Sequence, residues 1–524
     1  MTIGAEPNSL HVVNNVYQSV DRVEVVVAGA GPTGLVLACE LRLAGIEVAL
    51  IDTLPERTGQ SRAGGINART MEIFDQRGWL ERLLPDGYVV PGNVPGHFAG
   101  IPMASGDLAT RYPTGLVITQ ADLETQLDRY ATELGAPVQW ESPVVGIDQD
   151  AAGIEVRIGG AHPRRVRAAY LIGCDGGRST VRKLAGIGFT GTDATMVGMI
   201  ADVELSDPPS GWILTRRRGP GDFSVLPLQP RWFRLMVNRH DRVIDPATEP
   251  SFDEFRAAFR EVADTDYGMH SPQWVSQFGD AARLADRYRR DRVLLAGDAA
   301  HIHYPAGGQG LNTGVQDAAN LGWKLAAVLR GRAPESLLDT YESERRPVAT
   351  RVLDNTRAQT ALMRPGPHTD ALRQTMADLF DVDEVPNRLA AMLFALDIRY
   401  DVGHNHPLSG YRVPDAALSR PTGDTRIHAL LRSGRAVLLS LNDTRLSPPP
   451  EWSAHVDSVN AYSQSEQWTV PGLGEIATPA AVLVRPDGHI AWASDDADTR
   501  GLPEALTTWV TAESSDHHHN GPMR

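Results

Sequence analysis

The pattern of apolar and polar positions divides the chain into three regions, and the first opens with alternating strands and helices. Residues 23–28 form an apolar run, which a glycine-rich turn separates from a helix pattern at 35–43 and a second apolar run at 47–52. Two buried strands joined by a helix make a βαβ unit of a parallel sheet. A later apolar run at 292–298 precedes a long helix pattern at 312–330 and predicts a further strand and helix of the same kind.

The second region alternates apolar and polar residues in short segments between Pro and Gly. The predicted strands are 199–205, 212–216, 223–228 and 233–238. This pattern predicts an antiparallel sheet inserted into the α/β framework, followed by a helix at 252–262. Polar, helix-forming sequence occupies residues 336–392.

The composition changes again after about residue 405. Apolar runs at 436–441 and 480–484 predict buried strands, and a Pro-Asp-Gly turn leads the second run into another strand at 489–493. A helix at 503–510 follows. Residues 1–21 are polar, lack periodicity and are predicted to form a loosely ordered tail.

Composition and charge exclude several classes of protein. The chain has 524 residues, of which 42% are hydrophobic and 22% charged, and its formal net charge is −15. That surplus of acid opposes binding to nucleic acid or to an anionic membrane. Cys39 and Cys174 are the two cysteines, so a disulfide framework or a cysteine-based zinc site is excluded. With no signal-peptide pattern and no apolar run long enough to span a bilayer, we expect a cytoplasmic protein.

A Gly-x-Gly-x-x-Gly motif occupies residues 29–34, directly between the first predicted strand and helix. Gly29 permits the tight turn, Gly31 lets the backbone approach a pyrophosphate, and Gly34 lets helix and strand pack closely. The helix N-terminus offers free N–H groups and a positive dipole end to the phosphates. Asp52 ends the next strand about 20 residues on, where it can bind ribose hydroxyls. The unit predicts a dinucleotide site but does not separate FAD from NAD.

A second glycine-rich element follows the strand predicted at 292–298. Asp298 ends that strand and can accept a hydrogen bond from a polyol chain, and the glycines of 305–312 let a flat ring lie against bare backbone. The helix start at Asn312 would aim its dipole at a group that becomes negative on reduction, as flavin N1 and O2 do. A nicotinamide dehydrogenase needs no such site, so the pair of elements favours FAD. His301 and His303 have no third ligand at suitable spacing, and we predict no metal there.

Between these elements, residues 173–182 by themselves predict a strand-to-helix turn with a polar cap. The three motifs in this order resemble the flavoprotein aromatic hydroxylases of the para-hydroxybenzoate hydroxylase class, over roughly residues 23–347. The stretches 61–72 and 307–314 look like those of the subgroup that acts on polyketide aromatics and rifamycin-type drugs.

The resemblance implies an α/β fold with three domains. A glutathione-reductase-type, Rossmann-like FAD domain is expected at 22–188 and 280–400, and a substrate-binding antiparallel sheet at 189–279, which part of 85–115 could join. Residues 405–524 resemble the thioredoxin-like appendage of the phenol-hydroxylase branch. They contain no Cys-x-x-Cys pair, which excludes redox chemistry there. Thr478-Pro479 matches a position that is cis in thioredoxin folds, and we predict a cis bond.

The resemblance also implies which residues form the site. Its cofactor-binding set is Gly29, Gly31, Pro32, Thr33, Gly34, Asp52, Arg62, Gln120, Asp175, Asp298, Gly308, Gly310, Leu311 and Asn312. Arg62 and Pro305 are expected to position flavin and substrate where they react. At Asp52 the family more often has Glu. The apolar pocket candidates are Phe98, Trp212, Phe223, Leu226 and Trp232, for which core packing is the favoured interpretation.

The implied activity is an NAD(P)H- and O2-dependent hydroxylation of a large aromatic, polyketide-type substrate through a flavin C4a-hydroperoxide. FAD would be held non-covalently, and NADPH or NADH would bind transiently without a domain of its own. Gly472-Leu473-Gly474 is no second dinucleotide motif, because a strand follows it. A Baeyer–Villiger, epoxidising or ring-cleaving monooxygenase and an inactive FAD-fold ligand-binding protein stay open as alternatives. The protein is expected to be a monomer or a homodimer. The histidines at 517–519 are not expected to form a metal site.

Overall fold

The computed structural model describes most of the chain. The described residues are 20–90, 96–104, 106, 108–211, 213–229, 231–243, 249–496 and 498–510. Nearly all of the predicted N-terminal tail, Trp212 and the histidines at 517–519 therefore lie outside the described residues.

A six-stranded sheet forms the centre of the first region, in the order β21-β22-β13-β2-β3-β9. Its strands are β2 (Val25–Ala28), β3 (Val48–Ile51), β9 (Val138–Gln139), β13 (Tyr170–Gly173), β21 (Arg289–Arg290) and β22 (Val293–Leu295). All neighbours pair in parallel except β21 and β22. Every residue of β2, β3, β13 and β22 is buried, as expected for a parallel sheet covered on both faces. The predicted strands of this region are confirmed.

Helices pack around this sheet, and several of them follow its strands in the chain. They are α1 (Pro32–Leu43), α2 (Ala68–Gln76), α4 (Gln120–Glu133), α5 (Thr180–Leu184) and α7 (Gln309–Leu329). The helix α1 packs against both α4 and α7. Because β2, β13 and β22 run in parallel, the loops that carry the glycine and aspartate motifs all leave the same edge of the sheet.

A separate four-stranded sheet, β1-β12-β11-β10, flanks the central one and was not predicted. Its strands are β1 (Val20–Arg22), β10 (Val144–Asp150), β11 (Gly153–Ile158) and β12 (Arg164–Ala168). In β11, buried Ile154, Val156 and Ile158 alternate with half-buried Glu155 and Arg157. This period of two is a strand signal that is present in the sequence.

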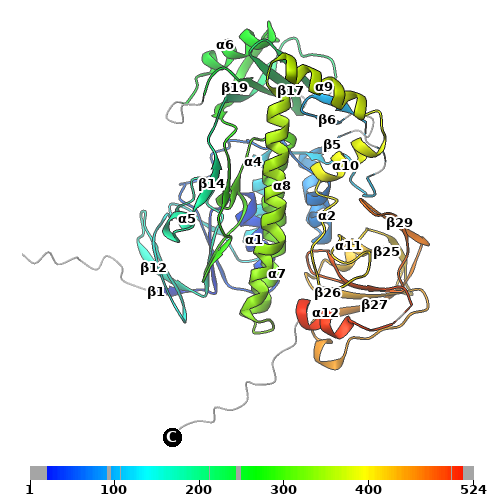
Figure 1. The fold of residues 1–524 in the computed structure, drawn as a ribbon. Helices are drawn as coiled ribbons and strands as arrows, with labels where there is room; N and C mark the ends of the chain where they lie inside the picture. The colour runs from blue at the N-terminus through cyan, green and yellow to red at the C-terminus, as the bar shows by residue number, and fades with distance from the viewer. Residues whose placement is uncertain are drawn as a thin grey trace, which may run out of the picture.

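The predicted antiparallel sheet is confirmed, with one strand more than the sequence pattern indicated. Its order is β16-β17-β18-β15-β19. The strands are β15 (Val197–Leu205), β16 (Leu214–Arg218), β17 (Gly221–Gln229), β18 (Trp232–Arg239) and β19 (Met269–Phe278). The strand β19 escaped prediction because most of its residues are polar or half-buried and it contains Pro272. Figure 1 shows this sheet in the upper part of the molecule and the C-terminal unit at the lower right.

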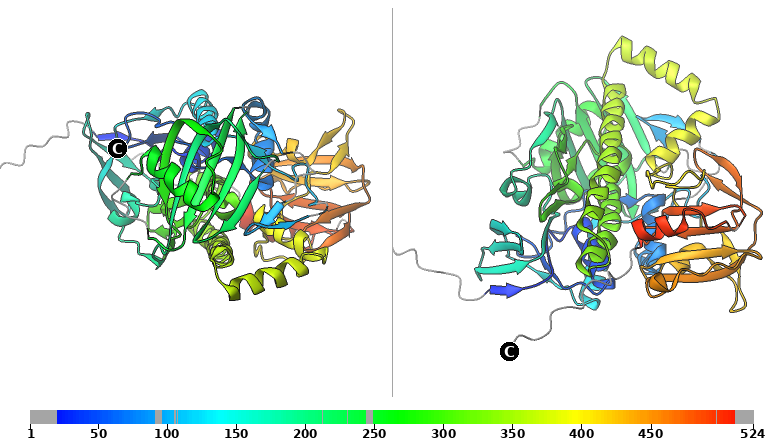
Figure 2. Two further views of the ribbon diagram at one scale, coloured as in Figure 1. Left: turned by 90° about the horizontal axis from the view of Figure 1, so that it is seen from above. Right: turned by 60° about the horizontal axis from the view of Figure 1, so that its bottom comes forward.

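The helix α6 (Phe252–Ala263) covers one face of that sheet with apolar side chains. Phe255 and Phe259 of the helix pack with Phe223, Val225, Leu235 and Val237 of the strands. Successive side chains of a strand point to opposite faces, so Asp202, Arg234 and Asn238 lie on the other face, away from α6. Seen from above in Figure 2, the sheet lies between α6 and the rest of the molecule.

None of the described residues between 85 and 115 adds a strand to the five-stranded sheet. They contribute β5 (Tyr88–Val89) to the small sheet β4-β8-β5, and β6 (Gly96–Phe98) and β7 (Ile101–Met103) to a hairpin of their own. The other two strands of the small sheet are β4 (Gly65–Ile66) and β8 (Leu116–Val117).

The predicted helical stretch at 336–392 contains α8 (Asp339–Met363), α9 (Pro367–Leu379) and α10 (Glu384–Leu393). Figure 1 shows α8 running along the molecule between the five-stranded sheet and the C-terminal unit. Within the parts of the chain that the structure describes, no helix is both long and apolar enough to cross a bilayer.

The C-terminal unit, from about residue 405, is built on a sheet with the order β25-β24-β27-β26-β30-β31. Its main elements are β26 (Ala436–Leu441), β27 (Val456–Ser463), β30 (Ala481–Val484), β31 (Ile490–Ser494) and α12 (Leu502–Trp509). The strands β26 and β27 are parallel, whereas β30 pairs antiparallel with β26 and with β31. The prediction of a cis Thr478-Pro479 bond is wrong, because the described residues contain no cis peptide bond. It rested on analogy alone, and nothing in the local sequence required it.

Candidate functional site

The glycine-rich turn after β2 has the geometry that a dinucleotide site requires. A side chain at Gly29 would lie 2.3 Å from the carbonyl oxygen of Cys174, and one at Gly34 would lie 1.9 Å from the carbonyl oxygen of Gly29. A side chain at Gly31 would have no neighbour within 4 Å. The outer two glycines therefore allow close packing, while Gly31 presents bare backbone toward open space, where a pyrophosphate can approach.

Asp52 lies beside this turn and helps to shape it. Its carboxylate accepts hydrogen bonds from Ala30 N–H at 2.7 Å and Leu54 N–H at 2.9 Å. Each oxygen of an ionised carboxylate can accept more than one bond. Asp52 can therefore hold the turn and still bind ribose hydroxyls.

Gln120 and Glu124, in the first turns of α4, belong to a chain of polar contacts that starts at the glycine turn. The Gln120 amide donates to Glu124 at 2.9 Å and accepts Ala63 N–H at 3.2 Å. Arg57 donates to both Glu124 and the carbonyl oxygen of Ala30, at 3.3 Å each. Burial raises the pKa of Glu124, against the opposing effects of Gln120 and Arg57. Arg57 was not predicted as a site residue, although it is a cation next to the proposed phosphate position.

Asp175 follows β13 and serves as a cap for α5. Its carboxylate accepts the Ser179 hydroxyl and the N–H groups of Thr180, at 2.7 Å, and Val181, at 3.0 Å. The polar-cap interpretation of this motif is thus confirmed. The segment also touches the first motif, through Cys174 against Gly29 and Gly34.

The second glycine-rich element packs directly on the first. A side chain at Gly297, where φ is +61°, would lie 2.6 Å from the Thr33 hydroxyl, and one at Gly314 would lie 2.2 Å from the same oxygen. Asp298, the next residue after Gly297, is exposed and has no recorded hydrogen bond to any described residue. Its carboxylate is therefore available to a ligand.

The entrance to α7 consists of two successive left-handed glycines. Gly307 and Gly308 have φ of +70° and +62°, and a side chain at Gly308 would have no neighbour within 4 Å. Asn312 accepts Asn67 N–H at 2.9 Å and donates to the Gly308 carbonyl at 2.8 Å. The Asn312 side chain thus fixes the glycine turn and ties it to the start of α2. The backbone N–H groups of the first turn of α7 remain for a ligand.

The loop that carries Arg62 is fixed by the five-stranded sheet. Arg234, buried on the face away from α6, donates to the carbonyl oxygens of Ser61 and, at 2.8 Å, Arg62. Asp202 holds Arg234 through two bonds of 2.8 Å and accepts the Trp274 indole N–H at 2.9 Å. The Arg62 side chain is exposed and makes no recorded hydrogen bond to the described residues. Its backbone is therefore anchored while its guanidinium is available.

Tyr304 and Pro305 lie where the α7 entrance meets the same face of the sheet. The Asn238 amide donates to the Tyr304 hydroxyl at 2.9 Å and to Asp222 at 2.7 Å. Burial raises the pKa of Tyr304 well above its usual value. Pro305 is exposed. The edge of the central sheet, the Arg62 loop and the polar face of the five-stranded sheet thus surround one region.

Of the apolar pocket candidates, Phe98 and Phe223 are core residues, as favoured. Leu226 and Trp232 are half-buried. Trp212 lies outside the described residues.

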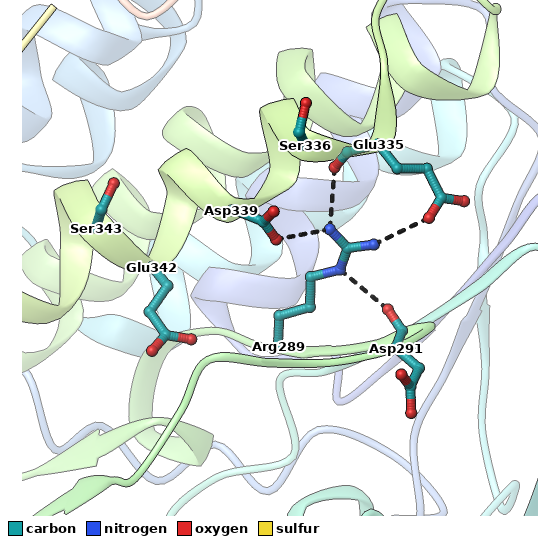
Figure 3. A pocket seen from close by; sticks show the side chains of 7 residues that line it. All are labelled: Arg289, Asp291, Glu335, Ser336, Asp339, Glu342 and Ser343. Atoms are coloured by element: carbon teal, nitrogen blue, oxygen red, sulfur yellow. Dashed lines mark hydrogen bonds and ion pairs between the residues drawn. The ribbon is translucent and has the colours of Figure 1, made fainter.

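Two other groups of charged residues are further candidates for a site. A surface hollow of about 650 Å³ is lined by Arg289, Asp291, Glu335, Ser336, Asp339, Glu342 and Ser343. Figure 3 shows that Arg289 bonds several of the others, and no apolar side chain is present to bind an aromatic ring. This hollow contains no residue of the glycine and aspartate motifs, and its charged lining does not suit an apolar aromatic ligand.

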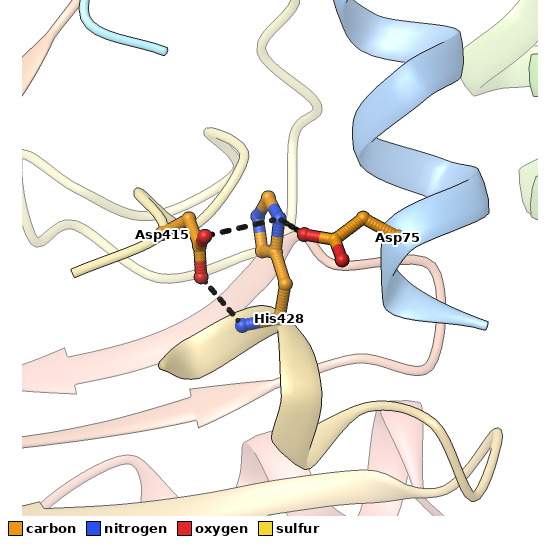
Figure 4. A group of neighbouring side chains, drawn as sticks. All are labelled: Asp75, Asp415 and His428. Atoms are coloured by element: carbon orange, nitrogen blue, oxygen red, sulfur yellow. Dashed lines mark hydrogen bonds and ion pairs between the residues drawn. The ribbon is translucent and has the colours of Figure 1, made fainter. Parts of the chain in front are cut away.

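The second place is a cluster of Asp75, Asp415 and His428, which could geometrically hold a metal ion. Figure 4 shows the imidazole between the two carboxylates, at 3.4 Å from Asp75 and 3.9 Å from Asp415. Arg111 pairs with both carboxylates and Arg426 with Asp415. Because two guanidinium groups already neutralise the acids, we interpret the cluster as an ion-pair contact between α2 and the C-terminal unit.

The contact between α2, α7, α8 and the C-terminal unit contains buried ion pairs that sequence reasoning missed. Arg485 binds Glu344 and Asp487, and Glu344 also pairs with Lys324 at 2.7 Å. Glu72 pairs with Arg412 at 2.8 Å. These partners lie up to hundreds of positions apart in the sequence, so no local pattern could indicate them.

Fold and site define a dinucleotide-binding protein of the flavoenzyme class. A family model described as an FAD binding domain matches residues 22–356, and one described as an aromatic-ring hydroxylase C-terminal domain matches residues 406–512. An anhydrotetracycline monooxygenase of Streptomyces rimosus is 44% identical, over 93% of this chain and 99% of its own. A rifampicin monooxygenase of Streptomyces venezuelae is 45% identical, over 94% and 99%.

A solved structure, the OxyS anhydrotetracycline hydroxylase from Streptomyces rimosus, superposes with a TM-score of 0.84. It is 43% identical and covers 93% of this chain and 99% of its own. The chain belongs to the FAD-dependent aromatic-ring hydroxylases. It is a flavin monooxygenase, and FAD is its cofactor.

Proposed function

We propose that this enzyme uses NAD(P)H and O2 to hydroxylate a large, polyketide-type aromatic substrate. The observation that carries the proposal is the meeting of three loops from parallel strand ends with the polar face of the five-stranded sheet. The 44–45% identity to monooxygenases named for anhydrotetracycline and rifampicin supports the substrate class.

FAD, when bound, supplies the activation of O2. The chain's own residues hold it: Gly31 offers backbone to the pyrophosphate, Asp52 binds ribose, and Asp298 accepts a hydroxyl of the polyol chain. The N–H groups at the start of α7 would hold the edge of the flavin ring, where the positive end of the helix dipole favours negative charge. The open space at Gly31 and Gly308 agrees with these roles.

The substrate would lie between the Arg62 loop, Pro305 and the face of the sheet that carries Arg234 and Asn238. Half-buried Leu226 and Met236 supply apolar surface on that face, and anchored loops on two sides restrict the access of water. Arg62 and Pro305 position cofactor and substrate for reaction. Because the described residues offer no separate nicotinamide domain, the reductant binds transiently at the flavin.

We also infer the finer architecture. A Rossmann-like strand order and the crossover helix α1 support a glutathione-reductase-type cofactor domain. Parallel β26 and β27, antiparallel β30 and β31, and the terminal α12 support a thioredoxin-like C-terminal unit, although the trans Thr478-Pro479 bond departs from that fold. The enzyme acts in the cytoplasm as a monomer or homodimer.

The test is product analysis with ¹⁸O2 and a set of planar polycyclic phenols. Hydroxylation adds one labelled oxygen and leaves the carbon rings intact. Ring expansion or an opened ring would establish the Baeyer–Villiger or ring-cleaving alternative. Oxidation of NADPH that no phenol stimulates, with no product, would indicate a ligand-binding protein.

A further inference from the structure

A buried chain of hydrogen bonds connects the C-terminal unit to the turn that carries Asp298. It begins at Asp317 of α7, whose side chain is fully buried. One carboxylate oxygen accepts Gly297 N–H at 3.1 Å and lies 2.8 Å from His301 Nε2. Asp317 thus binds the turn on both sides of Asp298.

Arg345 of α8 continues the chain. Its Nε donates to the second oxygen of Asp317 at 2.8 Å, and its Nη1 donates to the Tyr400 hydroxyl at 2.8 Å. Burial alone would raise the pKa of Asp317, but Arg345 and His301 outweigh it and hold that pKa below its usual value. The carboxylate is therefore ionised, and its hydrogen bonds are of the stronger, charge-assisted kind.

Tyr400 forms the contact with the C-terminal unit. Its ring centroid lies 4.3 Å from that of His489, which follows the Pro486-Asp487-Gly488 turn. The backbone N–H of Tyr400 donates to the carbonyl oxygen of Gly410 at 3.0 Å. The position of Tyr400 therefore depends on how the C-terminal unit packs against it.

The turn at the other end has little freedom. Gly297 has φ of +61°, and its Cα hydrogens face the Thr33 hydroxyl closely enough that no side chain would fit. A shift of Asp317 would therefore move Gly297 relative to the glycine motif at Thr33. Asp298, the residue after Gly297, would move with it.

We infer that Asp317 and Arg345 are positioning residues for the cofactor, and that Tyr400 links the docking of the C-terminal unit to the Asp298 turn. The inference rests on the proposed role of Asp298 in holding FAD. It gives the C-terminal unit a part in cofactor binding that needs no redox centre of its own.

A double-mutant cycle tests the link. FAD is titrated into the apoproteins of the wild type, Tyr400→Phe, Asp298→Ala and the double variant, and flavin fluorescence gives Kd. Tyr400→Phe should raise Kd about tenfold, equivalent to about 1.4 kcal/mol. In the Asp298→Ala background it should change Kd less than about twofold, because coupled residues are not additive.

Tyr288→Phe is the matched control. Tyr288 is buried in the same cluster, with its ring centroid 6.4 Å from that of His301, and its hydroxyl has no hydrogen-bond partner among the described residues. Its Kd should equal that of the wild type. If Tyr400→Phe does not fold, Arg345→Lys keeps the charge and loses the bridge to Tyr400, and the same tenfold rise is expected.

Unchanged Kd in folded Tyr400→Phe, or in folded Arg345→Lys if that variant is needed, overturns the inference, and so do additive effects in the cycle. Full affinity in Asp298→Ala overturns both the inference and the proposed role of Asp298. A loss in Asp298→Ala without a loss in Tyr400→Phe overturns the inference alone.

Discussion

Two polar regions of this molecule look alike in composition and differ in how their groups are satisfied. At the contact with the C-terminal unit, Glu344, Glu72 and Asp487 are buried and each is paired with arginine. At the carboxyl edge of the central sheet, the side chains of Asp298 and Arg62 are exposed and make no hydrogen bond or ion pair with the described residues, and Gly31 faces open space.

The difference leads us to expect that unused hydrogen-bonding capacity, rather than charge density alone, distinguishes the proposed ligand site. A buried ion that is already paired is costly to disturb and has no bond to offer. An anchored loop whose polar tip is free can bind a ligand without reorganisation.

The largest effect should come from breaking the interface network. Glu344→Ala leaves Arg485 and Lys324 without their shared partner, and removal of one member of a buried pair costs about 3–5 kcal/mol. The free energy of unfolding from urea titration is the measurement. Glu335→Ala removes a side chain that is 58% exposed and should cost less than about 1 kcal/mol. Equal losses in the two variants would contradict the contrast.

Acid should weaken the same interface. Burial alone would raise the pKa of Glu344, but Arg485 and Lys324 reverse this and lower it to about 2. The unfolded chain binds that proton near pH 4.3. The stabilisation is therefore present above that pH and is lost as the pH falls toward about 2, an effect of order 3 kcal/mol. Stability measured from pH 6 to pH 2 checks this, and Glu344→Gln should flatten the curve.

At the cofactor edge, Asp298→Ala should lose FAD and keep its fold. In the proposed site the Asp298 carboxylate gives FAD a charge-assisted hydrogen bond worth about 1.5–3 kcal/mol, and no described partner is left unpaired by its removal. Flavin content after purification and Kd for FAD are the measurements, with Asp354→Ala on exposed α8 surface as the control. Wild-type flavin content would disprove the assignment.

The smallest effect concerns the control of reduction. In the proposed site the flavin moves to meet NADPH, and the Arg62 guanidinium bonds its ring edge in only one of the two positions. NADPH should then reduce the flavin slowly until a planar aromatic substrate binds and shifts the equilibrium between the positions. Substrate should raise the stopped-flow reduction rate by about tenfold, or about 1.4 kcal/mol. Arg62→Ala should abolish this stimulation, and exposed Arg129→Ala should keep it. Equal rates with and without substrate in the wild type would remove the gating, not the monooxygenase assignment.

The sequence predicted well which motifs meet at the carboxyl edge of the central sheet, because each motif there is local. Gly29 to Gly34, Asp52 and Asp298 follow apolar strands directly, so the carboxyl-edge rule for parallel sheets brings them together. The anchoring of the loops was not predictable. Arg234 reaches the Ser61 and Arg62 carbonyls across more than 170 positions, and Asp317 and Arg345 look like ordinary helix residues.

The C-terminal unit was predicted as strands and a helix, but its attachment was not. Apolar runs reveal buried strands, whereas the pairing of Arg69 with the Asp487 carbonyl over 418 positions depends on the complete fold. The strand β19 was missed for a related reason, since its exposed and half-buried polar residues give no apolar pattern of their own, and its place in the sheet depends on pairing with β15.

The Pro486-Asp487-Gly488 turn limits how freely the C-terminal unit can be exchanged between related proteins, by engineering or by evolution. A side chain at Gly488 would lie 2.6 Å from the Gln76 amide of α2, and the Pro486 carbonyl accepts a bond from Arg77 at 2.8 Å. The C-terminal unit therefore packs closely against the end of α2, and we expect that it cannot be exchanged as an independent module. A chimera with a relative's unit will fold only if the donor supplies the same turn together with counterparts of Arg412 and Arg485.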